Sequence, residues 1–136
     1  MRQHSLKITY LIHKTLVEDT EVKKLIEENH IWPIVVPENL TYPYMTIKRN
    51  SIQNMVGNKD FAGDTVNFTL SVYSDDYDDS VSIADAARLA LENHILQDDS
   101  IRLERITIIS ASEDWVGNAY AQTMSFKAEV YKPRQL

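Results

Sequence analysis

The feature that most constrains this sequence is a strict alternation of apolar and polar residues in two separate segments. The apolar members are Val66, Phe68, Leu70 and Val72 in the first segment, and Met124, Phe126, Ala128 and Val130 in the second. A strand places every second side chain on the same face, so each segment predicts one apolar face and one polar face. Both segments therefore predict strands of an antiparallel sheet that is covered on one side only.

Two longer segments have apolar residues at the spacing of a helix. Residues 5–19 place Leu6, Tyr10, His13, Leu16 and Val17 on one stripe, which Ile8, Leu11 and Ile12 widen. Residues 79–96 place Val81, Ala84, Ala87, Leu91 and Ile95 on one face. Residues 21–28 predict a short helix that buries Val22, Leu25 and Ile26, with Asp19 or Thr20 as its N-cap. We expect the two longer helices to cover the apolar face of the sheet.

Further strands are predicted around these elements. Residues 31–36 form an apolar run that Pro33 confines to an edge, and residues 42–48 predict a better strand. Residues 101–111 predict another long strand with a bulge near Leu103 or Ile109, because the alternation fails there. The polar residues 50–64 and 112–120 are interpreted as connections between strands.

The order of these elements predicts an α+β fold. We expect an antiparallel sheet of about four to five strands, with two main helices packed on one face. The 136 residues fit a single domain over 1–136, and no linker or low-complexity tract divides them.

Composition excludes several classes of function. The chain has no cysteine, which excludes a disulfide framework, a thiolate metal site and a cysteine nucleophile. Its net charge is −6 and it lacks a run of Lys or Arg, so sequence-specific nucleic-acid binding is not expected. Neither a signal peptide nor an apolar stretch of membrane-spanning length is recognised, so we expect synthesis in the cytoplasm and no membrane partner.

Motifs that would indicate catalysis are missing from the sequence. Three glycines provide neither a phosphate-binding loop nor a dinucleotide fingerprint, and no serine lies in a nucleophile elbow. The four histidines lack the close spacing of metal ligands. We therefore expect no catalytic residue, no cofactor and no metal. An enzyme or ligand-binding domain would need a closed apolar pocket, for instance near His13 or His94.

The acidic cluster at residues 75–79 has two interpretations. A calcium-binding loop starting at Asp76 would place Val81 where a glycine is needed and Ala87 where a bidentate glutamate is needed. The alternative is a solvated turn whose carboxylates cap the helix that follows. The second interpretation is favoured because the calcium pattern fails at both positions.

Two apolar sites in the predicted connections are candidates for contact with other proteins. Trp115 lies between acidic residues and Gly117, in a predicted turn. Exposed aromatic residues are favoured at protein interfaces, although this ring could equally fold back over the core. Met55 and Val56 have the same two interpretations.

The order of the segments and two motifs resemble a known protein family. Leu40–Ile47 looks like the start of a strand with the family's small-Pro-Tyr-apolar pattern, and it follows a short apolar strand at Ile31–Pro33. Val72–Tyr77 ends a strand with an aromatic residue and a Ser-Asp turn, and leads into an Ala-rich helix at Ile83–Leu91. This is the tail-completion, or tail-to-head joining, family of long-tailed phages, which is similar to lambda-type tail terminators.

The resemblance implies a non-enzymatic, structural role in virion assembly. Family members form a six-fold ring that ends the tail tube and presents a face to the head connector. The implied partners are other copies of the chain in a homo-hexamer, the tail tube protein and the head connector protein. The implied location is the host cytoplasm during assembly and then the tail of a phage or prophage particle. The alternative is another phage or host assembly adaptor that acts as a dimer or monomer.

A ring needs arms that reach a neighbour, and the two predicted connections could supply them. The candidate interface residues are Met55, Val56, Asp60, Phe61, Trp115, Val116, Asn118 and Tyr120. A further hypothesis is that Asp60, Asp64 or the cluster at 75–79 lines a central channel and repels DNA.

Overall fold

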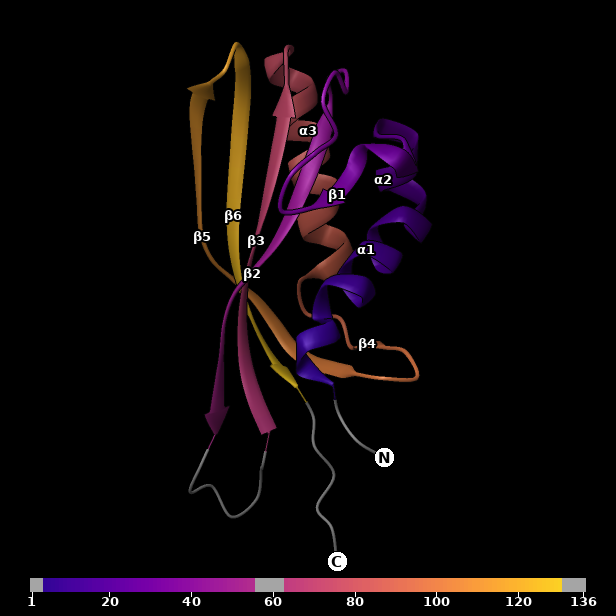
Figure 1. The fold of residues 1–136 in the computed structure, drawn as a ribbon, viewed down its shortest axis with the longest axis vertical. Coiled ribbons are helices and arrows are strands. Elements are labelled where there is room, and N and C mark those ends of the chain that lie inside the picture. The colour runs from indigo at the N-terminus through magenta and orange to yellow at the C-terminus, as the bar shows by residue number, and fades with distance from the viewer. Residues whose placement is uncertain (1–3, 56–62, 131–136) are drawn as a thin grey trace, which may run out of the picture.

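The computed structural model of the protein describes residues 4–55 and 63–130 (Figure 1). Its α-helices are α1 (Ile8–Glu18), α2 (Thr20–Leu25) and α3 (Tyr77–Leu91), and short 3-10 turns lie at Ser5–Lys7 and Glu28–His30. Its strands are β1 (Ile31–Pro33), β2 (Tyr44–Met55), β3 (Gly63–Ser74), β4 (Leu96–Gln97), β5 (Arg102–Val116) and β6 (Ala119–Val130). The helices lie on one side of the sheet, as expected.

The α+β class is confirmed, but the strand count and the uniform antiparallel pairing are not. The described residues form a sheet of six strands in the order β1-β2-β3-β6-β5-β4. Strands β1 and β2 pair in parallel, and the other neighbours pair antiparallel. Strands β1 and β4 have only three and two residues, too few for a period of two to be recognised.

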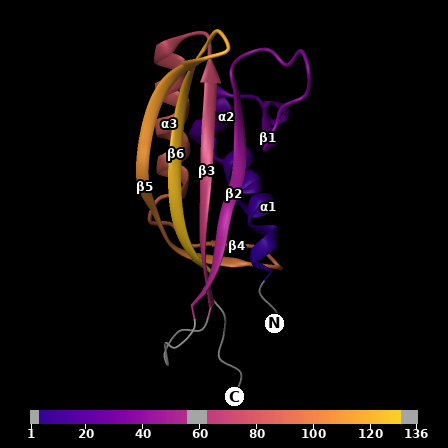
Figure 2. The ribbon, with the colours of Figure 1, turned by 60° about the vertical axis from the view of Figure 1, so that its left-hand side comes forward.

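The two alternating segments form the centre of this sheet. Strands β3 and β6 pair along their whole length, and Phe68 lies directly opposite Phe126. The two rings stack with centroids 5.2 Å apart, and both side chains are fully buried. Figure 2 shows β2, β3, β6 and β5 side by side, with the helices behind them. The predicted apolar face is therefore the floor of the core.

Helix α1 buries only part of the broad apolar face that was predicted for it. Leu6 and Tyr10 are 68% and 74% exposed, whereas the buried side chains are Ile8, Leu11, Ile12 and Leu16. Apolar residues surround more than half of this helix, and only one side of it can contact the sheet. Leu6 also precedes α1, in the turn at Ser5–Lys7. The other apolar side is left exposed.

The outer positions of the other helices were also wrongly predicted as core. Leu25, Val81 and Ile95 are exposed, whereas Ala84, Ala87 and Leu91 are buried as expected. Helix α3 ends at Leu91 rather than Leu96, and two residues later Asn93 has a φ of 64°. A left-handed residue turns the chain away from the helix axis, so Ile95 does not belong to the helical face.

The four long strands extend through residues that were predicted as connections. Strand β2 continues to Met55, β3 begins at Gly63, and β5 continues to Val116. The ends of β2 and β5 are largely exposed, so their side chains have no reason to alternate, and backbone pairing defines them. The predicted bulge is confirmed, because the register of β5 with β6 shifts between Ile108 and Ser110. None of the described helices is long and apolar enough to cross a membrane.

Candidate protein interface

The tip of the β5–β6 hairpin presents the candidate residues Trp115, Val116, Asn118 and Tyr120. Gly117 and Asn118 form the turn with φ values of 57° and 67°, as in a two-residue type I′ hairpin. Trp115 lies opposite Tyr120 in the ladder, and their rings meet edge to face with centroids 5.0 Å apart. Trp115 is still 56% exposed. The ring therefore rests against the sheet and remains available for contact.

A hydrogen-bonded cluster joins this hairpin to the start of α3. Tyr77 stacks edge to face on Tyr120, and its hydroxyl donates to Glu113 Oε2 at 2.8 Å. Gln122 Nε2 donates to the same carboxylate at 3.1 Å. These two hydrogen bonds lower the pKa of Glu113, and the bond from Gln122 has the larger effect. The hydrogen bond to Glu113 raises the pKa of Tyr77. The cluster fixes the hairpin relative to the helix.

A row of tyrosines covers the helix-free side of the same hairpin. Tyr42 stacks on Tyr44 with centroids 5.1 Å apart, and Tyr44 meets Tyr73 at 5.3 Å. The Tyr42 hydroxyl donates to Gly117 O at 2.9 Å. Beside this row, Ala121 is buried outside the main core, next to Tyr73 in the ladder. Aromatic side chains therefore pack against both faces of the sheet at this end of the molecule, which we call the aromatic end.

The other candidate arm lies at the opposite end of the sheet. Met55 ends β2 and pairs with Gly63, whereas Tyr44 pairs with Tyr73 at the aromatic end. Val56, Asp60 and Phe61 lie outside the described residues, as does the side chain of Met55. Their role in an interface therefore stays a prediction.

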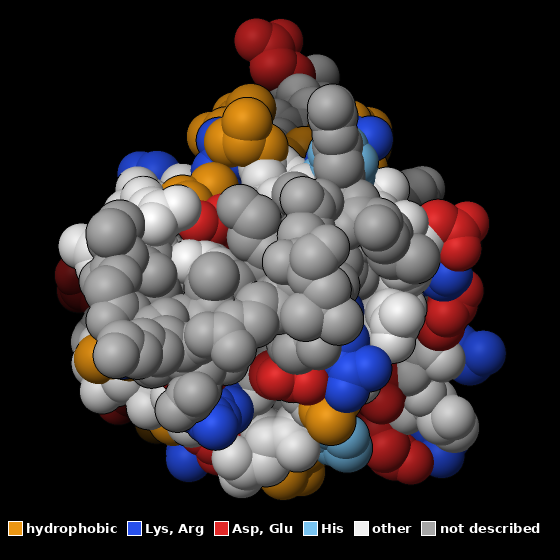
Figure 3. Space-filling view, turned by 90° about the horizontal axis from the view of Figure 1, so that it is seen from below, with side chains coloured by type: hydrophobic (Ala, Val, Ile, Leu, Met, Phe, Trp, Pro, Cys, Tyr) orange, Lys and Arg blue, Asp and Glu red, His pale blue; other side chains and the backbone are white. Residues whose placement is uncertain are grey.

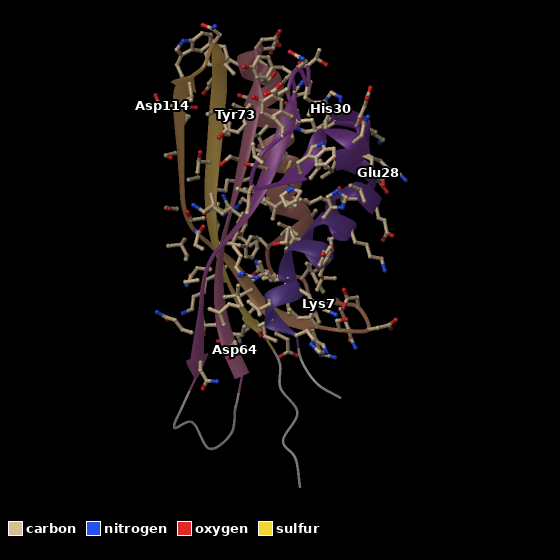
Figure 4. The ribbon with its side chains drawn as sticks, viewed as in Figure 1. Lys7, Glu28, His30, Asp64, Tyr73 and Asp114 are labelled. Carbon is tan, nitrogen blue, oxygen red and sulfur yellow. The ribbon has the colours of Figure 1, made fainter. Side chains whose placement is uncertain are left out.

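The acidic residues considered for a channel do not form one patch. Figure 4 places Asp64 near one end of β3, where its carboxylate accepts from Ser5 Oγ at 2.5 Å. The cluster at 75–79 follows the other end of β3, and Asp76 Oδ1 accepts from Asp79 N at 3.0 Å. This bond confirms the predicted N-cap of α3. Asp60 is outside the described residues.

The end of the molecule near Asp64 has mixed charge. Figure 3 views this end, and acidic and basic side chains are interspersed around its rim. In the described part of the chain, no group of three or more His, Asp or Glu side chains is arranged to hold a metal ion.

A large apolar groove between α1 and β1 was missed from the sequence. It has a volume of about 860 Å³ and is lined by Leu6, Thr9, Tyr10, His13, Glu28, Asn29, Ile31, Trp32, Pro33, Ile34 and Arg49. The signal was the second apolar stripe of α1, which was assigned to the core. Leu6, Tyr10 and Ile34 are about 70% exposed, so this is an open groove rather than a closed pocket.

The groove does not assemble catalytic groups. The sequence suggested His13 as a possible pocket residue. Its Nε2 contacts the backbone oxygen of Ile31 at 3.1 Å. His30 and Trp32 likewise use ring nitrogens on backbone oxygens, those of Pro43 and Asn29. The polar atoms here hold β1 in place, and the apolar surface between them suits a protein partner.

Comparison with known proteins identifies the family of the chain. A search of the curated proteins found no match. A chain in a solved structure described as the virion of a native gene transfer agent (GTA) particle has the same fold, with a TM-score of 0.78 and 20% identity, over 92% of this chain and 95% of that one. A second solved structure aligns with a TM-score of 0.60 and 13% identity, over 97% and 99%. The family model "Tail completion protein gp17" matches residues 11–128, and the chain therefore belongs to the tail completion protein gp17 family.

Proposed function

We propose that this protein is a non-enzymatic subunit of a ring that completes the tail of a phage or prophage particle and joins it to the head. The observation that carries the proposal is the family match over residues 11–128. The shared fold with a chain of a gene transfer agent virion supports it. The partners would be other copies of the chain, six in a ring, together with the tail tube protein and the head connector protein.

The shape of the protein is compatible with this role. A ring requires two different surfaces on each subunit, because each copy contacts one neighbour with one side and the next with the other. The groove between α1 and β1 and the exposed strand β5 lie at opposite edges of the sheet. An adaptor that acts as a dimer or monomer would need only one of them, and this favours the ring.

Deletion of the gene from its parent phage or prophage tests the proposed function. We expect separate heads and tails in electron micrographs, because the joining subunit would be missing. Purified protein added to the mutant lysate should restore joined particles, whereas a chain truncated before β6 should not. Joined and infectious particles from the deletion strain would contradict the proposal.

A further inference from the structure

The described sheet has a long unpaired stretch of backbone on each of its two edges. Strand β4 pairs only with Leu103 and Arg102, and the end of α3 bonds β5 at Ile106 O and Ile108 N. From Ile109 to Val116, β5 pairs only with β6. At the other edge, β1 pairs with Met45–Ile47, so β2 beyond Ile47 pairs only with β3. These statements concern residues 4–55 and 63–130.

The exposed edge of β5 lacks the lysine and proline that commonly keep an edge strand from pairing. Monomeric proteins place lysine or proline on such edges, or keep them short. The stretch 109–116 contains no Lys, Arg or Pro, and Ile109, Trp115 and Val116 are each about half exposed. Edge-to-edge pairing with another chain is the outcome that such a strand favours.

The strand directions allow a second copy to supply the partner strand. Strands β2 and β6 run one way, and β3 and β5 run the other way. A copy related by rotation about an axis to which the strands are tilted therefore places its β2 antiparallel to β5 of the first copy. This contact joins two different edges, so it is head-to-tail and can close into a ring.

Charge selects the register of this pairing. Glu113 and Asp114 on β5 have no Lys or Arg partner among the described residues, and Lys48 and Arg49 on β2 have no acidic partner there. Placing Asp114 opposite Lys48 in an antiparallel ladder also places Glu113 opposite Arg49. Opposite charges that face each other across strands stabilise a sheet.

The faces of the sheet agree with the same register as far as Asn50, where the register of β2 with β3 shifts. Glu113 contacts Tyr77 of α3, and Arg49 donates to Leu6 O, so both side chains lie on the helix side. Asp114 and Lys48 have the alternate parity and lie on the helix-free side. In the ladder of one copy Lys48 is level with Ser110, so this register is a stagger of four residues, about 13 Å. A stagger of this kind is what closure of a sheet into a cylinder requires.

We propose that residues 112–114 of β5 pair with residues 48–50 of β2 in a second copy of the chain, with Asp114 opposite Lys48. The inference rests on the proposed ring and names its contact surface. In this register Trp115 lies opposite Ile47, to which Pro33 pairs and Ile34 N bonds. The indole therefore contacts the groove at Ile34. A single contact between two copies thus covers both the free edge of β5 and part of the groove.

Disulfide cross-linking tests the register directly, because the chain has no cysteine of its own. The variants Ser112→Cys and Asn50→Cys place one thiol on each proposed edge, directly opposite each other and both on the helix-free side. The two full-length variants are mixed at high concentration and oxidised, alone and with tail tubes. We expect a disulfide-linked heterodimer. Ser112→Cys mixed with Ser82→Cys, on the exposed side of α3, is the control and should stay unlinked.

Each outcome of this experiment decides between alternatives. A dimer from Ser112→Cys alone would indicate symmetric pairing of two β5 edges and would overturn the inference. Rings seen by microscopy without the mixed cross-link would overturn the inference and leave the proposed function standing. The mixed cross-link with only open chains, even on tail tubes, would support the contact and contradict the ring. Absence of both would overturn both.

Charge exchange supplies an independent test. Lys48→Asp or Asp114→Lys places like charges opposite each other, and each should weaken self-association at least about tenfold. The double variant restores the opposite charges in reverse order and should regain most of the association. A double variant that associates more weakly than either single variant would contradict the register, because the two defects would then be additive.

Discussion

At the scale of single residues, the hairpin tip is defined by one carboxylate and the groups that bind it. Glu113 accepts from Gln122 and Tyr77, and Tyr120 lies between Trp115 and Tyr77. These residues belong to three elements, β5, β6 and the start of α3. The exposed indole of Trp115 is thus held in one orientation by contacts that the sequence could not predict, since they join residues up to 43 positions apart.

The pKa of Glu113 tests this cluster. Removing a donor with Gln122→Ala or Tyr77→Phe should raise the Glu113 pKa toward the ordinary value near 4.3. A carboxyl whose pKa is lowered by folding adds stability above its unfolded pKa, and that contribution is lost as the pH falls through the folded pKa. NMR titration of the carboxyl carbon measures the shift, with Ser112→Ala as the control. An unchanged Glu113 pKa in both donor variants would contradict the cluster.

The stacked phenylalanines test the placement of the core. Phe126→Ala removes a fully buried ring and should lower the free energy of unfolding by about 3–5 kcal/mol. Ile109→Ala is the matched control on an exposed strand edge and should change it by no more than about 0.5 kcal/mol. Chemical denaturation measures both values. Equal losses would mean that Ile109 is buried in the isolated protein, contrary to the exposed edge.

At the scale of elements, the end of α3 is tied to the bulge of β5. Glu92 accepts from Ile108 N at 2.9 Å and pairs with Arg88 at 3.0 Å. This contact gives the backbone N–H of Ile108 a hydrogen-bond partner on the open edge of β5. The unpaired stretch begins at the next residue, Ile109. The carboxylate therefore sets where the free edge starts.

The pH dependence of stability tests this tie. The bond from Ile108 N is the main reason that the pKa of Glu92 is lowered, and Arg88 adds to it. Glu92→Gln should lower the urea midpoint at pH 7, because the amide accepts more weakly and loses the attraction of Arg88. The difference from the unmodified chain should shrink as the pH falls from about 4.3, the ordinary pKa of a glutamate, through the lowered pKa that Glu92 has in the folded protein. A difference that is the same at pH 7 and pH 3 would contradict this assignment.

The elements show which patterns in a sequence are reliable. The alternation in 65–73 and 123–130 predicted β3 and β6 because one face of each is buried. Residues 50–55 were predicted as a connection because they are mostly polar, and pairing with β3 makes them a strand. The stripe of Leu6 and Tyr10 on α1 was assigned to the core because apolar spacing does not show which side contacts the sheet. These two errors hid the free edge of β2 and the groove.

At the scale of the whole molecule, residues 4–55 and 63–130 form a one-sided sheet with helices on one face and a stretch of unpaired backbone at each edge. The family match accounts for most of the chain, and the two edges suggest how copies could associate. Asp64 and the acidic cluster at 75–79 lie at opposite ends of β3, so they do not form one acidic patch. Association through the edges depends on backbone pairing and therefore needs no alternating pattern in the sequence.

Native mass spectrometry of the full chain at high concentration, followed by negative-stain imaging, tests the proposed ring most directly. The same sample is measured alone and after mixing with tail tubes, because closure could require the tube as a template. We expect six copies in a closed ring with a central hole, free in solution or at the tube end. A stable dimer, or a monomer that forms no ring even with tubes present, would contradict the proposed function.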